Sequence, residues 1–230
     1  MKLFYDLHIH SALSPCGDND MTPNNIVNMS ILKGLDVIAV SDHNSIQNLY
    51  SVMDVAKKTN LIVIPAMEVE TAENIHVLTL FPNIDSAEVV YKKVYDNLPN
   101  IDNNKAIFGD QLIMDAMDNV INEEYKLLVN STMLDFDDVI KLTRNVGGIA
   151  IPAHIDRSSY SVLSNLGTVP DLDFKYLEIS KSANEDMYQY LGCKFIRNSD
   201  AHYLFDIFEA ENSIECEKKT LDDFLKALSE

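Results

Sequence analysis

The sequence is poor in cysteine, and it lacks both long apolar runs and a secretory pattern. Its three cysteines, Cys16, Cys193 and Cys216, are odd in number and far apart, which disfavours a disulfide framework and predicts a reducing, cytoplasmic location. No segment reaches the ~18 consecutive apolar residues of a membrane span. The N-terminal stretch MKLFYDLHIH turns polar at once, unlike a secretory signal. We therefore expect no membrane partner.

Basic residues are also scarce. The chain has 18 Lys and Arg against 36 Asp and Glu, a formal net charge of −18. A surface of this sign repels a phosphate backbone, so we expect no binding to long nucleic acid. A small anionic substrate remains compatible, because bound divalent cations would dominate the field inside a site.

Short apolar runs alternate with helical patterns along the chain. The predicted strands are 3–7, 36–41, 61–67, 75–80, 148–153, 175–179 and 194–198, and the predicted helices are 23–34, 45–59, 86–97, 135–145 and 221–229. Such alternation is typical of βα units around a mostly parallel sheet. With 230 residues and 47% hydrophobic content, the sequence predicts one α/β domain over 1–230. We expect a distorted, seven-stranded, TIM-like (β/α)7 barrel.

One stretch breaks this rhythm. Residues 99–134 contain many Asn and Asp, with a helix predicted near 108–121. We interpret 99–134 as a polar insertion between strands four and five. A cover of this kind over a barrel mouth often shapes substrate access.

The six histidines carry the strongest functional pattern. His8 and His10 end the first strand two residues apart, so both should point to one face. The ends of later strands carry His43, Glu68, His154, Asp200 and His202. In parallel barrels, chemistry collects at these carboxyl ends. His76 instead begins the fourth strand, which fits if that strand runs against the others or starts near the rim.

Imidazoles and carboxylates without clustered thiolates suit Zn, Mn or Fe. These eight residues and an aspartate of the loop after the first strand, Asp18 or Asp20, make nine candidate ligands, which are too many for one ion and predict two to three divalent metal ions. Adjacent ions of this kind can activate a water and stabilise phosphoryl oxygens.

Six ordered segments carry a family resemblance: D-L-H-I-H-S, S-D-H-N, A-M-E-V-E, I-H-V-L, G-G-I-A-I-P-A-H and N-S-D-A-H. They resemble the PHP (polymerase and histidinol phosphatase) family in order and spacing, from residue 6 to 202. The resemblance implies a distorted seven-stranded βα barrel, up to three metals and hydrolysis of phosphoesters.

The resemblance also implies a ligand set. The first ion would be held by His8, His10, Glu68 and Asp200, the second by Glu68 as a bridge with His76 and His154, and the third by Asp18, His43 and His202. Among these, Glu68, Asp200 and His202 are predicted to be catalytic. The loop C-G-D-N-D also offers Asp20 and Cys16. Its offset from Pro23 favours Asp18, and a soft thiolate is not needed in a site of nitrogen and oxygen donors.

Cationic groups for a phosphate are few. Arg157 follows His154 by three residues and could grip a phosphate bidentately, with Lys181 as a second candidate. We therefore predict a phosphoesterase for a small phosphomonoester, such as a nucleotide, or for the 5′ end of a short oligonucleotide.

Three alternatives remain open. One is a histidinol-phosphate phosphatase, which the same family resemblance allows. Another is an amidohydrolase-type hydrolase, although the third strand ends in Glu68 and strand four carries no lysine to bridge two metals. The last is a non-catalytic metal-binding module, although open clusters with carboxylates favour catalysis.

Overall fold

A computed structural model describes residues 1–230 and shows an α/β fold around a curled sheet of six strands in the order β10-β1-β2-β3-β4-β7. These strands are β1 (Lys2–Ile9), β2 (Val37–Val40), β3 (Ile62–Glu70), β4 (His76–Leu80), β7 (Ile149–Pro152) and β10 (Ser213–Glu215). A separate parallel pair consists of β8 (Tyr176–Ile179) and β9 (Lys194–Arg197). The α/β class and all seven predicted strands are confirmed. A continuous seven-stranded barrel is not, because β8 and β9 pair only with each other.

Strand β4 runs against its neighbours. It pairs antiparallel with both β3 and β7, and the β3–β4 register sets Glu70 opposite His76. The start of β4 therefore lies at the same end of the sheet as the end of β3. This confirms the condition under which His76 was expected to join the other histidines.

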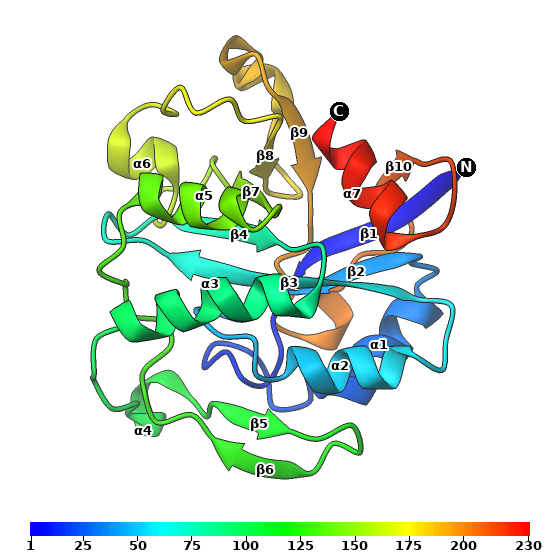
Figure 1. The fold of residues 1–230 in the computed structure, drawn as a ribbon, viewed down its shortest axis with the longest axis vertical. Coiled ribbons are helices and arrows are strands. Elements are labelled where there is room, and N and C mark those ends of the chain that lie inside the picture. The colour runs from blue at the N-terminus through cyan, green and yellow to red at the C-terminus, as the bar shows by residue number, and fades with distance from the viewer.

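Helices cover the outer face of the sheet. They are α1 (Pro23–Leu32), α2 (Leu49–Ala56), α3 (Ile84–Asn97) and α5 (Phe136–Asn145), and Figure 1 shows α1, α2 and α3 along one side of it. Thr22 caps α1 through the Asn25 N–H at 3.3 Å, with Pro23 in the first turn. Their apolar sides pack on outward residues of the strands, including Ile38 and Val40.

The inner face forms a second core. It contains Leu3, Tyr5 and Leu7 with residues of the neighbouring strands, and α7 (Leu221–Ser229) closes it with Phe224 and Leu228. Because side chains alternate between the two faces of a strand, Glu68 lies on the same inner face as Ile64 and Ala66, two residues further toward the end of β3. The metal-ligand candidates thus stand directly above a packed apolar layer.

A β-bulge in β1 decides where the histidines point. Tyr5 pairs with Val37 and Asp6 with Ile38, but Ile9 pairs with Val40, so β1 has one extra residue between Asp6 and Ile9. Such an extra residue reverses the alternation of faces. His8 and His10 therefore share the inner face with Leu3, Tyr5 and Leu7, while Ile9 belongs to the outer core.

The segment 99–134 differs from its predicted structure. It holds the short helix α4 (Lys105–Phe108) and a hairpin of β5 (Leu112–Met114) and β6 (Val120–Glu123), seen at the bottom of Figure 1. The helix predicted near 108–121 is wrong because Asp115 accepts the backbone N–H groups of Met117 and Asn119, which makes a turn.

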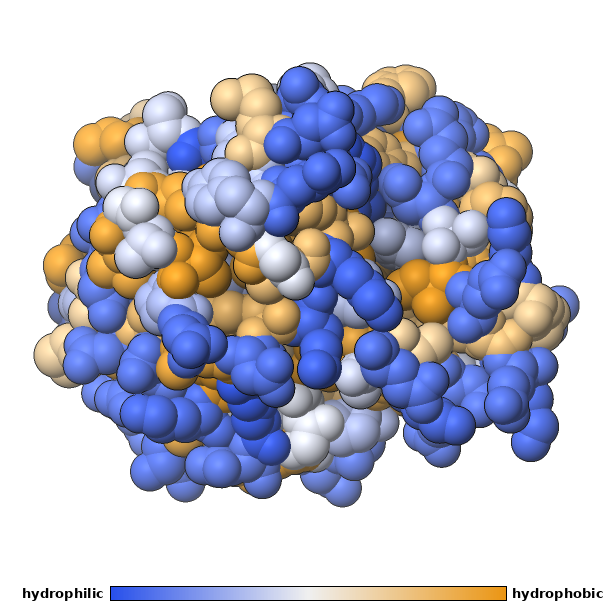
Figure 2. Space-filling view, turned by 90° about the horizontal axis from the view of Figure 1, so that it is seen from above, coloured by the Kyte–Doolittle hydropathy of each residue, from blue (hydrophilic) through white to orange (hydrophobic).

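The remaining elements are short. They are α6 (Val162–Leu166), η1 (Glu185–Met187), η2 (Gln189–Leu191) and η3 (Leu204–Asp206). None of the helices has the length and apolar character needed to cross a membrane. Figure 2 shows the face seen from above in Figure 1, where hydrophilic side chains predominate and hydrophobic ones form separate groups.

Candidate metal centre

The carboxylate of Glu68 lies at the centre of five imidazoles. Its side chain is 1% exposed. The nearest nitrogens are His76 Nδ1 at 2.9 Å, His43 Nδ1 at 3.0 Å, His8 Nε2 at 3.2 Å, His154 Nε2 at 3.2 Å and His10 Nε2 at 3.4 Å. One carboxylate therefore contacts histidines from β1, β4 and the ends of β2 and β7, which is the arrangement a bridging ligand needs.

Asp200 forms a second focus beside it. Its Oδ1 lies 3.0 Å from His10 Nε2 and 3.4 Å from His8 Nε2. Three groups bring their ligand-type atoms within 4.8 Å of one another, and each could hold an ion: His8, His10 and Asp200; His43, Glu68 and His76; and His10, Cys16, His43 and His202.

Buried carboxylates orient the histidines from behind. Nδ1 of His8 donates to Glu178 Oε1 at 3.0 Å, which leaves Nε2 facing Glu68 and Asp200. Glu178 also accepts the His154 N–H at 2.9 Å and the Asn198 amide at 2.7 Å. Glu178 therefore fixes the tautomer and direction of a candidate ligand, as is usual around a metal-binding histidine.

Ser14 plays a similar part for His10. Its hydroxyl donates to Asp42 Oδ1 at 2.7 Å and accepts both His10 Nδ1–H at 3.0 Å and the His43 N–H at 3.1 Å. A hydroxyl has one proton and two lone pairs, so all of its capacity is used. Nε2 of His10 therefore keeps its lone pair for the site.

The charges of the cluster suit a cation. Burial would raise the pKa of Glu68, but His76, His8 and His43 outweigh it and hold that pKa well below its usual range. Burial also disfavours protonation of His202 and lowers its pKa to about 4, with His10 acting in the same direction. Burial lowers the pKa of His8 and His76 less than the facing carboxylates raise it: Glu178 and Glu68 hold the pKa of His8 well above its usual range, and Glu68 raises that of His76 to about 9. A metal ion binds ionised carboxylates and neutral imidazoles, so an ion bound by these two rings would displace their protons.

Several buried ligand-type atoms lie close to one another but make no well-aligned hydrogen bond, among them His8 Nε2, His43 Nδ1 and Glu68 Oε2. Unpaired polar atoms are costly inside a protein, and their convergence fits divalent ions. The backbone is also strained at two of these residues, since His154 and Asp200 have positive φ of 30° and 51°. Residues other than glycine adopt positive φ at a cost in free energy, and such residues cluster at functional sites.

The structure brings together eight of the nine predicted ligands. They are His8, His10, His43, Glu68, His76, His154, Asp200 and His202. Asp18 is in none of the three ligand groups, and its Oδ1 accepts the Asp20 N–H at 2.8 Å. Cys16, which the sequence analysis set aside, is in one of them.

A cavity of about 340 Å³ opens onto this cluster. Its wall includes Arg157, whose guanidinium lies 2.6 Å from Asp200 Oδ2, and the rings of Phe108 and Tyr160. Tyr160 stacks on His76 with ring centroids 4.9 Å apart. The sequence did not predict either aromatic residue, because no ligand-type spacing marks them.

Lys181 lies outside this cavity. Its Nζ stands 5.0 Å from the centroid of the Phe208 ring, and it lines an adjoining hollow of about 180 Å³ that shares Arg157 and Asp200 with the main cavity. Arg157 is therefore the predicted phosphate ligand that the structure sets beside the cluster.

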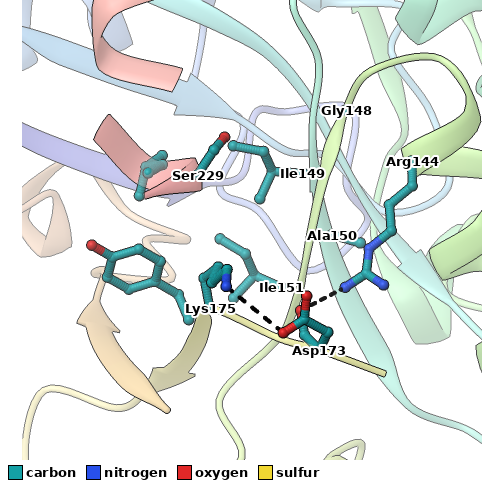
Figure 3. Close-up of a pocket in the computed structure, with 10 residues that line it drawn as sticks. Arg144, Gly148, Ile149, Ala150, Ile151, Asp173, Lys175 and Ser229 are labelled. Carbon is teal, nitrogen blue, oxygen red and sulfur yellow. Dashed lines mark hydrogen bonds and ion pairs between the residues drawn. The ribbon is translucent and has the colours of Figure 1, made fainter. Parts of the chain in front are cut away.

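Another cavity, of about 280 Å³, lies at the opposite end of the sheet (Figure 3). There Asp173 lies 3.7 Å from Lys175 Nζ, and its carbonyl accepts a hydrogen bond from Arg144 at 3.3 Å. No predicted ligand lines this cavity. Asp173 is the only carboxylate in its wall, which contains no histidine or cysteine, so this cavity offers no rival metal centre.

The sequence matches the PHP domain family over residues 6–195, and the chain belongs to this family. The prediction of a metal-dependent hydrolase is confirmed with it. A curated relative, the uncharacterized protein MJ1587 of Methanocaldococcus jannaschii, is 32% identical over 88 residues, 35% of this chain and 51% of that protein. The match thus spans about half the length of that relative.

Solved structures share the fold. The lesion-specific endonuclease Q of Pyrococcus furiosus superposes with a TM-score of 0.75 at 20% identity, covering 99% of this chain and 56% of that one. Endonuclease Q in complex with a 27-mer duplex carrying an abasic lesion gives 0.74 at 20% identity, with 100% and 57% covered. A Bifidobacterium adolescentis protein described as a metal-dependent phosphoesterase gives 0.58 at 14% identity, with 97% and 94% covered.

Proposed function

We propose that this domain hydrolyses a small phosphomonoester, such as a nucleotide or the 5′ end of a short oligonucleotide, with two to three Zn, Mn or Fe ions. The observation that carries the proposal is Glu68, ringed by five imidazoles at the base of a cavity that also holds Arg157. Bound divalent ions would supply Lewis acidity and an activated water to this site.

The ligand assignment is part of the proposal. His8, His10 and Asp200 would hold one ion, and His76 and His154 a second, with Glu68 between them. The remaining ion would be held by His43 and His202. Glu178 and Ser14 would then hold Nδ1 of His8 and of His10, which leaves Nε2 of each ring for the ion.

Arg157 would bind the phosphoryl group. Its side chain is 46% exposed and stands at the cavity wall, where a guanidinium can contact two phosphate oxygens at once. Its pairing with Asp200 holds it beside the cluster. Lys181 lines the adjoining hollow, where it would contact a second charged group of a larger substrate.

The aromatic wall favours a nucleotide. Phe108 and Tyr160 are 41% and 47% exposed, and both line the cavity. A nucleobase stacked on an aromatic side chain gains about 1–3 kcal/mol. Sugar phosphates lack the planar aromatic ring that would stack on this surface.

A second candidate is cleavage within a nucleic acid. The structural similarity to endonuclease Q, with a TM-score of 0.75, favours this class over other phosphodiesters. The net charge of −18 opposes binding of a long duplex by this chain alone. We therefore rank a short or single-stranded substrate above a duplex.

The test is a panel of nucleotides, short oligonucleotides with and without a 5′ phosphate, an abasic-site duplex, histidinol phosphate, sugar phosphates and an amide, assayed with Zn²⁺ or Mn²⁺. We expect phosphate release from nucleotides or 5′ ends, with KM raised by Phe108→Leu and by Tyr160→Leu. Preference for histidinol phosphate, cleavage of the amide or internal cleavage of the duplex would each replace the proposal. No turnover at full metal loading would favour a non-catalytic metal-binding module.

A further inference from the structure

We propose that the Cys16 thiolate is a ligand of the ion held by His43 and His202, in place of the Asp18 carboxylate. The inference rests on the metal centre of the proposed function but not on its reaction. It gives this centre one site with a sulfur donor beside sites of nitrogen and oxygen donors.

The geometry points to Cys16 through four donor atoms. Cys16 Sγ and one ring nitrogen each of His10, His43 and His202 lie within 4.8 Å of one another. The side chain of His43 is 7% exposed, and its Nδ1 lies 3.0 Å from Glu68 Oε2 without making a well-aligned hydrogen bond. His202 donates Nδ1–H to the Asp200 carbonyl at 2.8 Å, so its Nε2 lone pair is free.

The loop after β1 is fixed so that Cys16 faces this group. The Gly17 N–H donates to the Ser14 carbonyl at 2.8 Å, and the Asp18 N–H donates to the His202 carbonyl at 2.9 Å. A Cβ at Gly17 would lie 2.5 Å from the Ser11 carbonyl oxygen, so only glycine permits this close packing. Cys16 is thus tied on one side to the end of β1 and on the other to His202.

Asp18 serves the loop instead. Its Oδ1 accepts the Asp20 N–H at 2.8 Å, and its carbonyl accepts the Met21 N–H at 2.9 Å. The carboxylate therefore closes a local turn of the kind that Asp side chains often make. It belongs to none of the three ligand groups.

A thiolate changes which metal this site selects. Two imidazoles and a thiolate form a borderline-soft donor set that favours Zn²⁺ over Mn²⁺. The Glu68 and Asp200 sites have harder donors and accept either ion. We therefore expect one position per chain to retain Zn²⁺ in an excess of Mn²⁺.

The experiment loads the metal-free full chain with Co²⁺ or Zn²⁺ and compares wild type with Cys16→Ser and Asp18→Asn. Cys193→Ser is the control, because Cys193 is partly buried and far from the cluster in the fold. Thiolate-to-cobalt absorption in the near ultraviolet and zinc per chain by elemental analysis are measured. We expect only Cys16→Ser to lose the band and one equivalent of zinc. Asparagine at 18 keeps the oxygen that accepts the Asp20 N–H.

A cobalt band that survives Cys16→Ser would overturn the inference, as would loss of one zinc in Asp18→Asn alone. Alkylation of Cys16, mapped by mass spectrometry, gives an independent readout, and Zn²⁺ should protect the wild-type thiol. Full zinc loading and turnover without a cobalt band would refute the sulfur ligand and leave the proposed function intact. A cobalt band without turnover of any phosphoester would support the Cys16 ligand and contradict the proposed function.

Discussion

Nδ1 of His8 lies 3.0 Å from Oε1 of Glu178, and this hydrogen bond joins β1 to β8 where no sheet pairing connects them. Glu178 is 2% exposed and also holds the backbone of His154. One carboxylate therefore positions two candidate ligands of different ions.

The first prediction concerns this contact. Glu178→Gln should lower metal affinity about 10–100-fold, because a partner that orients a ligating histidine typically contributes that much. Competition with a chromogenic chelator measures the change. Glu217→Gln, at an exposed position, is the matched control. Unchanged metal affinity in Glu178→Gln would mean that the hydrogen bond from His8 Nδ1 to residue 178 does not orient His8 for metal binding.

The second prediction concerns Glu68. Glu68→Ala should remove at least one ion per chain and reduce turnover more than about 1,000-fold, since it deletes the donor shared by two sites. Elemental analysis and phosphate release on the same preparations measure both effects. A folded variant with normal metal content would show that Glu68 is not the bridge.

The third prediction concerns stability without metal. Asp42 is 2% exposed and accepts Ser11 N–H at 2.7 Å, Ser11 Oγ–H at 2.6 Å and Ser14 Oγ–H at 2.7 Å. Asp42→Ala leaves these donors buried and unpaired, and should lower the free energy of unfolding by at least about 2 kcal/mol. Urea denaturation of the metal-free protein measures it. A loss under about 0.5 kcal/mol, the range of ordinary surface changes, would contradict the burial argument.

The fourth prediction concerns the contact between the 99–134 segment and the Cys16 loop. Gly109 has φ of +98°, and a Cβ there would lie 2.4 Å from the Pro15 carbonyl oxygen. Gly192 also has positive φ, at +69°, but a Cβ there meets nothing within 4 Å. Gly192 has the left-handed αL conformation with ψ of 12°, where alanine costs about 1–2 kcal/mol, whereas Gly109, with ψ of −178°, lies in a region that is essentially restricted to glycine. Only Gly109→Ala should add a steric loss, seen as a lower Tm than that of Gly192→Ala. Equal Tm values would mean that the backbone at Pro15 moves away from the added Cβ without a measurable loss of stability.

The fifth prediction separates the two candidate phosphate ligands. Arg157→Lys should raise KM for a phosphomonoester, because an ammonium cannot replace a bidentate guanidinium. Lys181→Ala should change KM much less, because its ammonium lies over Phe208 in the adjoining hollow. Steady-state kinetics on one substrate compares them, and a larger effect at Lys181 would reverse the assignment.

The sequence by itself determined the strand positions, the positions of the main helices and the set of histidines and acids that the strands present. The order of residues is enough for these predictions, because they depend only on local periodicity and on the ligand chemistry of the side chains. It failed where two local structures compete. The 108–121 helix was wrong because Asp115 closes a turn, and that competition between local hydrogen bonds is not resolved by composition.

Tertiary structure alone decided the details of the centre. The bulge in β1 turned His8 and His10 inward, and the reversed β4 brought His76 to Glu68. The same folding placed Cys16, rather than Asp18, among the histidines, because backbone hydrogen bonds to Ser14 and His202 fix the loop. A side chain's direction depends on register and loop closure, which are set only when distant strands pair.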